Sequence, residues 1–169
     1  MTKIKLGGNS RKEQKKEKIS SAWLHFLWAT LVKALAGFRS EISGSPDNLQ
    51  AHHLAGKPNL LLRYIEMDNG ICVTSGEHNF GFHHAGNVET YRGYAKKLRG
   101  EDVYERLALL KPRHDKISLV LIEEKLLRGL APFSEKIYDY YLAKDYKSGI
   151  IKAQYNKLFV KLQSSTEGK

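Results

Sequence analysis

Two short segments of this chain have the residue pattern of β-strands, and a helix is predicted directly after the second one. Leu49–Leu54 follows a turn signal rich in Ser, Gly, Pro and Asn, whereas Gly70–Thr74 is rich in β-branched residues. A long loop separates the two segments. Ser75 can cap a helix that carries Glu77 and His78. The predicted order is therefore strand, loop, strand, helix, and a small hairpin is the sheet that this pattern predicts.

Most of the other periodic segments are helical. Ser20 or Ser21 can cap a helix that runs to about Gly37. The apolar side chains of this helix fall near helical spacing and should form a core face: Trp23, Phe26, Leu27, Trp28, Leu31, Val32 and Leu35. C-terminal to the hairpin, helices are predicted over residues 89–98, 101–110, 117–129, 134–144 and 149–163. The predicted fold class is α+β, with an N-terminal helix and a mostly helical C-terminal part.

The charge of the chain favours a polyanionic partner. Its 169 residues suit one domain, or one domain with an appendage, and carry a net charge of +10. A well-solvated charged surface is the alternative explanation. The excess is uneven: the net charge is +5 over residues 1–18, −1 over 52–86, and +4 over both 91–116 and 144–169. We expect the basic flanks to contact phosphates and the near-neutral centre to hold a cation.

Histidines are concentrated in the near-neutral centre, which contains five of the seven. One imidazole of the hairpin, from His52 or His53, and that of His78 in the next helix could hold a divalent cation. The other hairpin imidazole would then remain as a base, because its neutral form is available near physiological pH. His25 and His114 are predicted to be ordinary half-buried polar residues.

Four separated blocks of residues occur in a specific order. They are Leu49-Gln50-Ala51-His52-His53-Leu54, Leu62-Arg63-Tyr64, Asp68-Asn69-Gly70-Ile71, and Glu77-His78-Asn79 with Phe82-His83 after it. In this order they resemble the HNH endonucleases of the ββα-metal fold, in the variant of phage-borne homing endonucleases. Phe38–Gly44 is similar to the lead-in strand of that family, with serine where a zinc-binding cysteine often stands. The resemblance covers roughly residues 37–92 and implies a ββα-metal (HNH) core.

The resemblance implies a role for each motif residue. His52 and His78 match the two metal ligands, and His53 matches the general base that deprotonates the attacking water. Asn69 matches the residue whose amide tethers the loop and holds the base in register. His83 is a candidate third ligand or phosphate contact, one residue later than the family pattern places it. Because the paired cysteines of many relatives are missing, no structural zinc is expected.

The implied activity is that of a metal-dependent endonuclease. It would hydrolyse phosphodiester bonds of double-stranded DNA and leave 5′-phosphate and 3′-hydroxyl ends. The implied cofactor is one divalent ion, expected to be Mg²⁺ in cells, although Mn²⁺, Ni²⁺ or Zn²⁺ can occupy such a site. Each copy would cut one strand, so a monomer nicks and a homodimer can cut both strands. The alternatives are a catalytically inactive DNA-binding module of the same fold and a nuclease directed at RNA.

The resemblance divides the chain into a basic arm over residues 1–18, a nuclease core with its supporting helix over 19–92, and a helical DNA-binding region over 93–169. Candidate DNA contacts lie in the arm and on one helical face C-terminal to the core: Lys12, Lys15, Lys16, Arg92, Lys96, Lys97 and Arg99. Tyrosines among the C-terminal lysines suit nucleic acid, or equally they cap a small helical core. A helix-turn-helix over residues 117–163 is a further possibility.

No membrane partner is expected. The most apolar run, Ala22–Ala36, is too short to span a bilayer and contains His25 and Lys33. The single cysteine, Cys72, excludes an internal disulfide and fits a reducing compartment. We therefore expect a cytoplasmic protein, located in the host cytoplasm if a phage encodes it.

Overall fold

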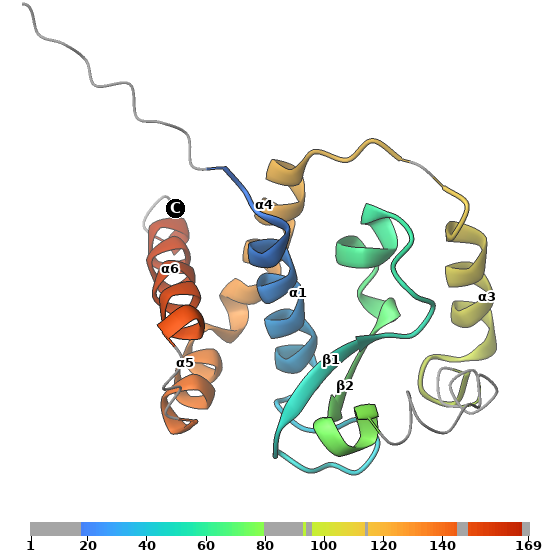
Figure 1. The fold of residues 1–169 in the computed structure, drawn as a ribbon, viewed down its shortest axis with the longest axis horizontal. Coiled ribbons are helices and arrows are strands. Elements are labelled where there is room, and N and C mark those ends of the chain that lie inside the picture. The colour runs from blue at the N-terminus through green and yellow to red at the C-terminus, as the bar shows by residue number, and fades with distance from the viewer. Residues whose placement is uncertain (1–17, 80–92, 94–95, 114, 145–148, 167–169) are drawn as a thin grey trace, which may run out of the picture.

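The structure is a computed structural model, and it describes residues 18–79, 93, 96–113, 115–144 and 149–166 (Figure 1). The fold is mixed α+β, mostly helical, with one small antiparallel sheet of two strands, which confirms the predicted class. Its elements are α1 (Ser21–Leu35), β1 (Leu49–His53), η1 (Leu61–Ile65), η2 (Met67–Asn69), β2 (Gly70–Thr74), α3 (Glu101–Leu110), α4 (Leu119–Leu130), η4 (Ala131–Phe133), α5 (Ser134–Ala143) and α6 (Gly149–Thr166). The helix predicted over 89–98 lies mostly outside the described residues.

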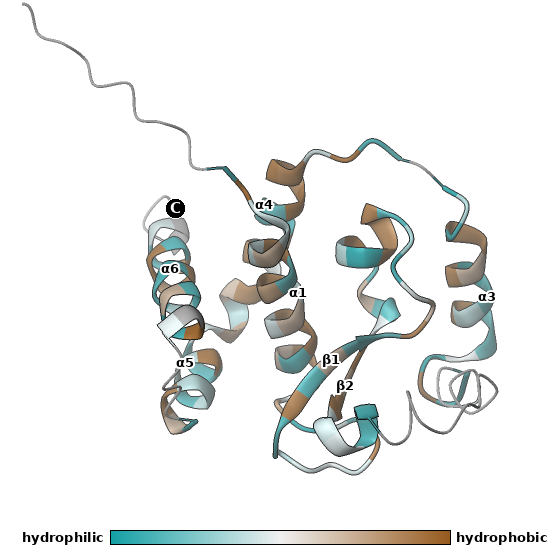
Figure 2. Ribbon diagram, in the orientation of Figure 1, coloured by the Kyte–Doolittle hydropathy of each residue, from teal (hydrophilic) through white to brown (hydrophobic). Residues whose placement is uncertain are grey.

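Helix α1 is the central element of the fold (Figure 1). Ser20 caps it by accepting a hydrogen bond from the backbone N–H of Trp23. The main core includes residues of α1, both strands, α4, α5 and α6, and Figure 2 shows hydrophobic residues concentrated on α1, α4 and β2. Trp23 and Trp28 are buried as predicted. The prediction for Leu35 was wrong: this last residue of α1 is 56% exposed, since the helix ends there and the chain turns at Gly37.

The two strands pair antiparallel, with Leu49 opposite Thr74 and His53 opposite Gly70. The expected lead-in strand over Phe38–Gly44 does not form, because Phe38 has a φ of +56° and the Ser40 hydroxyl accepts hydrogen bonds from two backbone N–H groups that follow it. Turns replace the strand. This segment still reaches the sheet, since the Glu41 N–H donates to the Cys72 carbonyl at 2.8 Å.

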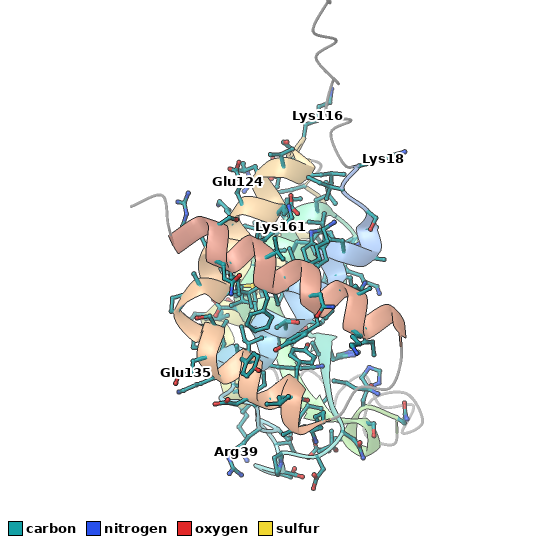
Figure 3. All side chains as sticks on the ribbon, turned by 90° about the vertical axis from the view of Figure 1, so that its left-hand side faces the viewer. Lys18, Arg39, Lys116, Glu124, Glu135 and Lys161 are labelled. Carbon is teal, nitrogen blue, oxygen red and sulfur yellow. The ribbon has the colours of Figure 1, made fainter. Side chains whose placement is uncertain are left out.

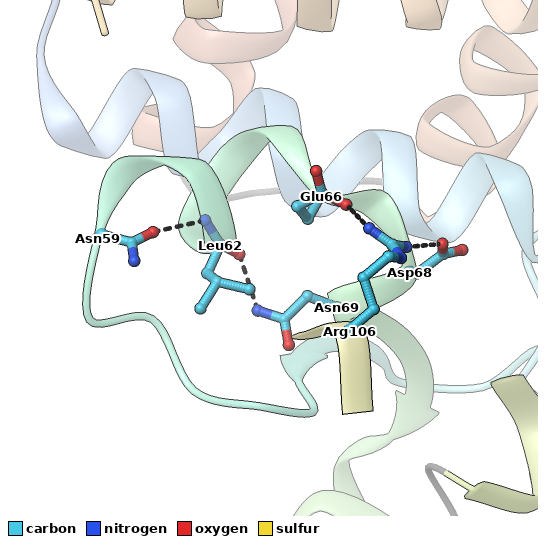
Figure 4. Close-up of polar contacts among 6 residues, drawn as sticks. All are labelled: Asn59, Leu62, Glu66, Asp68, Asn69 and Arg106. Atoms are coloured by element: carbon cyan, nitrogen blue, oxygen red, sulfur yellow. Dashed lines mark hydrogen bonds and ion pairs between the residues drawn. The ribbon is translucent and has the colours of Figure 1, made fainter. Parts of the chain in front are cut away.

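The connection between the strands is more ordered than the predicted loop, because it contains the short helices η1 and η2. Side-chain contacts with helix α3 fix this connection in place (Figure 4). Arg106 pairs with Glu66 at 2.6 Å and with Asp68 at 2.7 Å, and the Asn59 amide donates to the Leu110 carbonyl at the end of α3. These contacts come from residues about 40 to 50 positions later in the chain, so local sequence patterns do not reveal them.

Helices α5 and α6 pack on the other side of α1 from the hairpin, and Figure 3 views the face that they form. Helix α4 packs along α1 and also contacts η1. The buried Glu123 carboxylate of α4 accepts a hydrogen bond from the Trp23 indole and pairs with Lys161 of α6 at 2.9 Å. Tyr141 is buried, with its hydroxyl 3.0 Å from that of Thr30, which favours a core-capping role for this tyrosine. None of the described helices has the length and apolar character needed to cross a membrane.

Candidate active site

A groove of about 610 Å³ runs between α1 and β1 and contains the motif histidines. Helix α1 lines one side, and β1 lines the other side with the start of the following loop and His78. No Asp or Glu is among the described lining residues. The ionisable lining side chains are all basic or imidazole groups: His25, Lys33, His52, His53, Lys57 and His78. The groove is therefore suited to an anion, and an anion in it would lie beside the histidines.

His52 and His78 lie together as the sequence predicted, with Nδ1 of His52 2.9 Å from Nε2 of His78. Two nitrogens at this separation can both reach an ion about 2.1 Å from each, at an angle of about 90°, which is the angle between adjacent ligands of an octahedral ion. This separation is also that of a hydrogen bond between the two rings, and it leaves both nitrogens within reach of one divalent cation.

The helical segment that carries His78 is fixed by a capping box. The Thr74 hydroxyl accepts from the Glu77 N–H at 3.1 Å, and the Glu77 carboxylate accepts from the Thr74 N–H at 2.7 Å. Thr74 therefore caps residues 75–79 instead of the predicted Ser75, which is itself helical. The sequence does contain the signal, since Thr74 and Glu77 have capping-box spacing. The Ser40 hydroxyl also donates to Glu77 at 2.6 Å, which ties the segment to the turn after α1.

His53 lines the same groove as the imidazole pair, and a hydrogen bond defines its neutral tautomer. Its Nε2 is 2.9 Å from the Arg63 carbonyl, and because a carbonyl only accepts, Nε2 carries the proton. The ring therefore has an unprotonated Nδ1 in its neutral form. Desolvation lowers the pKa of His53 to about 4; the hydrogen bond to the Arg63 carbonyl opposes this shift, and the charges of His25, Lys57 and Arg63 add to it. The ring is thus neutral at neutral pH, and the lowered pKa makes it a weaker base than an ordinary histidine.

Asn69 is fully buried and holds the loop that orients His53. Its amide nitrogen donates to the Gly56 and Leu62 carbonyls at 2.7 and 2.8 Å, and its oxygen accepts from the Ala55 N–H at 2.6 Å. Leu62 directly precedes Arg63, whose carbonyl accepts the His53 proton. Asn69 therefore positions the base through the loop backbone.

His25 was not predicted to belong to the site, yet it lines the groove. Its ring centroid lies 5.4 Å from that of Trp28 and 6.4 Å from that of His53. Desolvation lowers its pKa, followed by the positive charges of Lys57 and Arg63. Local sequence gives no signal for this placement, because it depends on the packing of α1 against β1.

The residues predicted to contact DNA differ in their ion pairs and in their exposure to solvent. Arg99 pairs with Glu41 at 2.6 Å and donates to the Gly70 carbonyl at 2.8 Å, so it links residues 96–99 to the hairpin. Lys96 pairs with Glu101, whereas Lys97 is exposed. His83, Arg92, Lys12, Lys15 and Lys16 lie outside the described residues.

Within the described residues, no group of three or more His, Cys, Asp or Glu side chains could hold a metal ion. The pair of His52 and His78 is therefore the candidate ligand set that the described part of the chain provides. No family model, curated protein or solved structure matches the chain.

Proposed function

We propose that this chain is a metal-dependent endonuclease that hydrolyses phosphodiester bonds of double-stranded DNA. Its ββα-metal (HNH) core would consist of β1, the loop, β2 and the helical residues that begin at Ser75. The observation that carries the proposal is the convergence of His52 and His78 at 2.9 Å beside a neutral His53 ring, in a groove whose described lining residues include no carboxylate.

Each residue of the groove has a separate role in the proposed reaction. His53 accepts a proton from the attacking water at Nδ1, while the Arg63 carbonyl holds the opposite nitrogen in its protonated form. His52 and His78 would hold a divalent cation, which supplies a Lewis acid that neutralises charge developing on the phosphate. Lys57 also lines the groove, and its positive charge would attract the phosphate backbone. Two imidazole nitrogens favour a transition metal by affinity, whereas Mg²⁺ is the divalent cation favoured by its abundance in cells.

Attack by water activated at His53 leaves a 5′-phosphate and a 3′-hydroxyl. One base and one cation site per chain allow each copy to cut one strand, so a monomer would nick DNA and a homodimer could cut both strands. A nuclease directed at RNA is the second candidate, since an open groove lined by cations also accepts the RNA backbone. A binding module without activity is disfavoured, because a neutral base beside a ligand pair has no use in binding alone.

Incubation with supercoiled plasmid tests this function. We expect the wild-type chain to convert the plasmid to nicked or linear DNA with Mg²⁺ or Mn²⁺, and chelator to stop the reaction. His53→Ala and His78→Ala should lose at least 100-fold in rate, whereas Lys136→Ala, an exposed change on α5, should not. Equal cleavage by the wild type and His53→Ala would refute the assignment of the base. Cleavage of labelled RNA but not of plasmid would replace DNA by RNA as the substrate.

A further inference from the structure

Helix α1 presents a stripe of residues along the groove at intervals of one helical turn. His25, Ala29 and Lys33 all line the groove, and their spacing of four residues places them on one face of the helix. The Cα atoms of His25 and Lys33 are about 12 Å apart along the helix axis. His25 lies beside His53, so Lys33 marks the opposite end of this stripe.

Lys33 is a partly buried cation without an anionic partner in the described part of the chain. No ion pair joins its ammonium group to a carboxylate there, whereas Lys96, Arg99, Arg106 and Lys144 all form such pairs. Desolvation is the main cause that lowers the pKa of Lys33; the neighbouring Cys72 acts in the opposite direction, and the positive charge of Lys144 lowers the pKa further. Because burial raises the pKa of the Cys72 thiol to about 12, that group carries no charge at neutral pH to compensate Lys33. A desolvated charge that lacks compensation destabilises the folded chain, so its presence in a groove indicates an anionic ligand.

We infer that Lys33 binds a backbone phosphate of the nucleic-acid strand that is cut, at a phosphate other than the scissile one. The strand then lies along α1, with the scissile phosphate at His52, His53 and His78 and a neighbouring phosphate at Lys33. This inference rests on the proposed function and adds to it the path of the strand. It also explains why α1 carries a lysine on a face that otherwise packs against the hairpin: the ion pair of this lysine is completed by the substrate.

The test is binding of a labelled DNA duplex in chelator, where no cleavage occurs, as a function of salt concentration. Lys33→Gln should weaken binding roughly three- to tenfold at low salt and reduce the salt slope by about 0.9, the contribution of one phosphate contact. Lys136→Gln removes the same charge from an exposed position on α5 and is the matched control, with binding unchanged. The same titration with single-stranded RNA shows whether the contact is shared by both polymers.

Urea unfolding separates a binding role from a structural one. Because Lys33→Gln removes a desolvated charge, its unfolding midpoint should equal or exceed that of the wild type. A lower midpoint, or a salt slope equal to that of Lys136→Gln, would overturn the inference. Failure of the proposed function would give a different result. If the chain does not cleave but the strand follows this path, the wild type shows no cleavage, while Lys33→Gln still reduces the salt slope of DNA binding by one phosphate contact.

Discussion

The ring of His53 lies face to face on the indole of Trp28, with ring centroids 3.8 Å apart and an interplanar angle of 4°. Trp28 belongs to α1, whereas His53 is the last residue of β1. The stack covers one face of the imidazole, and the residue is 8% exposed; the hydrogen bond to the Arg63 carbonyl fixes the edge of the ring. The orientation of the candidate base thus depends on a helix outside the hairpin.

Substitution of Trp28 tests this dependence. Trp28→Phe retains an aromatic face for His53, whereas Trp28→Leu removes it, and both shorten a fully buried side chain. We expect each variant to lose about 1–4 kcal/mol of stability, and Trp28→Leu to cleave DNA at least tenfold more slowly than Trp28→Phe. Urea unfolding and plasmid nicking measure the two effects. Equal cleavage rates in variants of similar stability would show that the stack does not orient the base.

The same burial makes the stability of the chain depend on pH. The pKa of His53 is about 4 in the folded chain, against about 6.5 for an unfolded histidine. Between these values the unfolded state binds more protons, so the free energy of unfolding should fall as the pH drops from 6.5 to 4, by up to about 3 kcal/mol. Urea unfolding at several pH values measures this slope. His53→Gln should flatten it, and an unchanged slope in that variant would contradict the assignment.

Asn69 is predicted to be the most sensitive polar residue of the loop. Asn69→Ala leaves the Gly56 and Leu62 carbonyls and the Ala55 N–H without their partner, so we expect a loss of about 3 kcal/mol or more. Asn79→Ala, an exposed change on the helical segment after β2, should alter stability by less than about 0.5 kcal/mol. Urea denaturation of the two variants checks this contrast, and similar stabilities would mean that the loop holds its shape without the amide.

Elements whose signals are local could be predicted from the sequence. The bounds of β2 and α3 are those expected, because β-branched residues mark the strand and Gly100 and Pro112 delimit the helix. The order of strand, loop, strand and helix also predicts that one hairpin imidazole lies near His78, whereas the choice of His52 over His53 came from the family resemblance. Features fixed by distant residues could not be predicted. The helical turns of the loop depend on Asn69 and on Arg106, and the groove position of His25 depends on packing between α1 and β1.

Gly70 is required by close packing at the start of β2. A Cβ atom there would lie 2.5 Å from Cγ2 of Val32 and 3.2 Å from the Met67 carbonyl oxygen. Gly70→Ala should therefore destabilise the chain by about 2 kcal/mol or more. Gly129→Ala in α4 meets only the flexible end of Leu31, at 2.9 Å, and gains helix propensity, so its net effect should stay within about 1 kcal/mol. Thermal or urea unfolding compares the pair, and the opposite order would contradict the packing argument.

Lys97 and Arg99 were predicted to lie together on a phosphate-binding face, but helical spacing does not reveal what packs against that face. Arg99 and Glu41 form an ion pair with side chains 20% exposed, whereas Lys97 is exposed to solvent. Arg99→Gln leaves Glu41 and the Gly70 carbonyl without their partner, so we expect about 1–3 kcal/mol of lost stability and an unchanged salt slope of DNA binding.

Lys97→Gln should give the reverse pattern, with normal stability and a salt slope reduced by about 0.9 if this lysine contacts a phosphate. Urea unfolding and salt titration of DNA binding, performed on both variants, distinguish the two roles. If Arg99→Gln kept full stability and reduced the salt slope, Arg99 would be a phosphate contact and its pairing with Glu41 would not be needed for folding. Because both variants remove one positive charge from neighbouring positions, each serves as the charge control for the other.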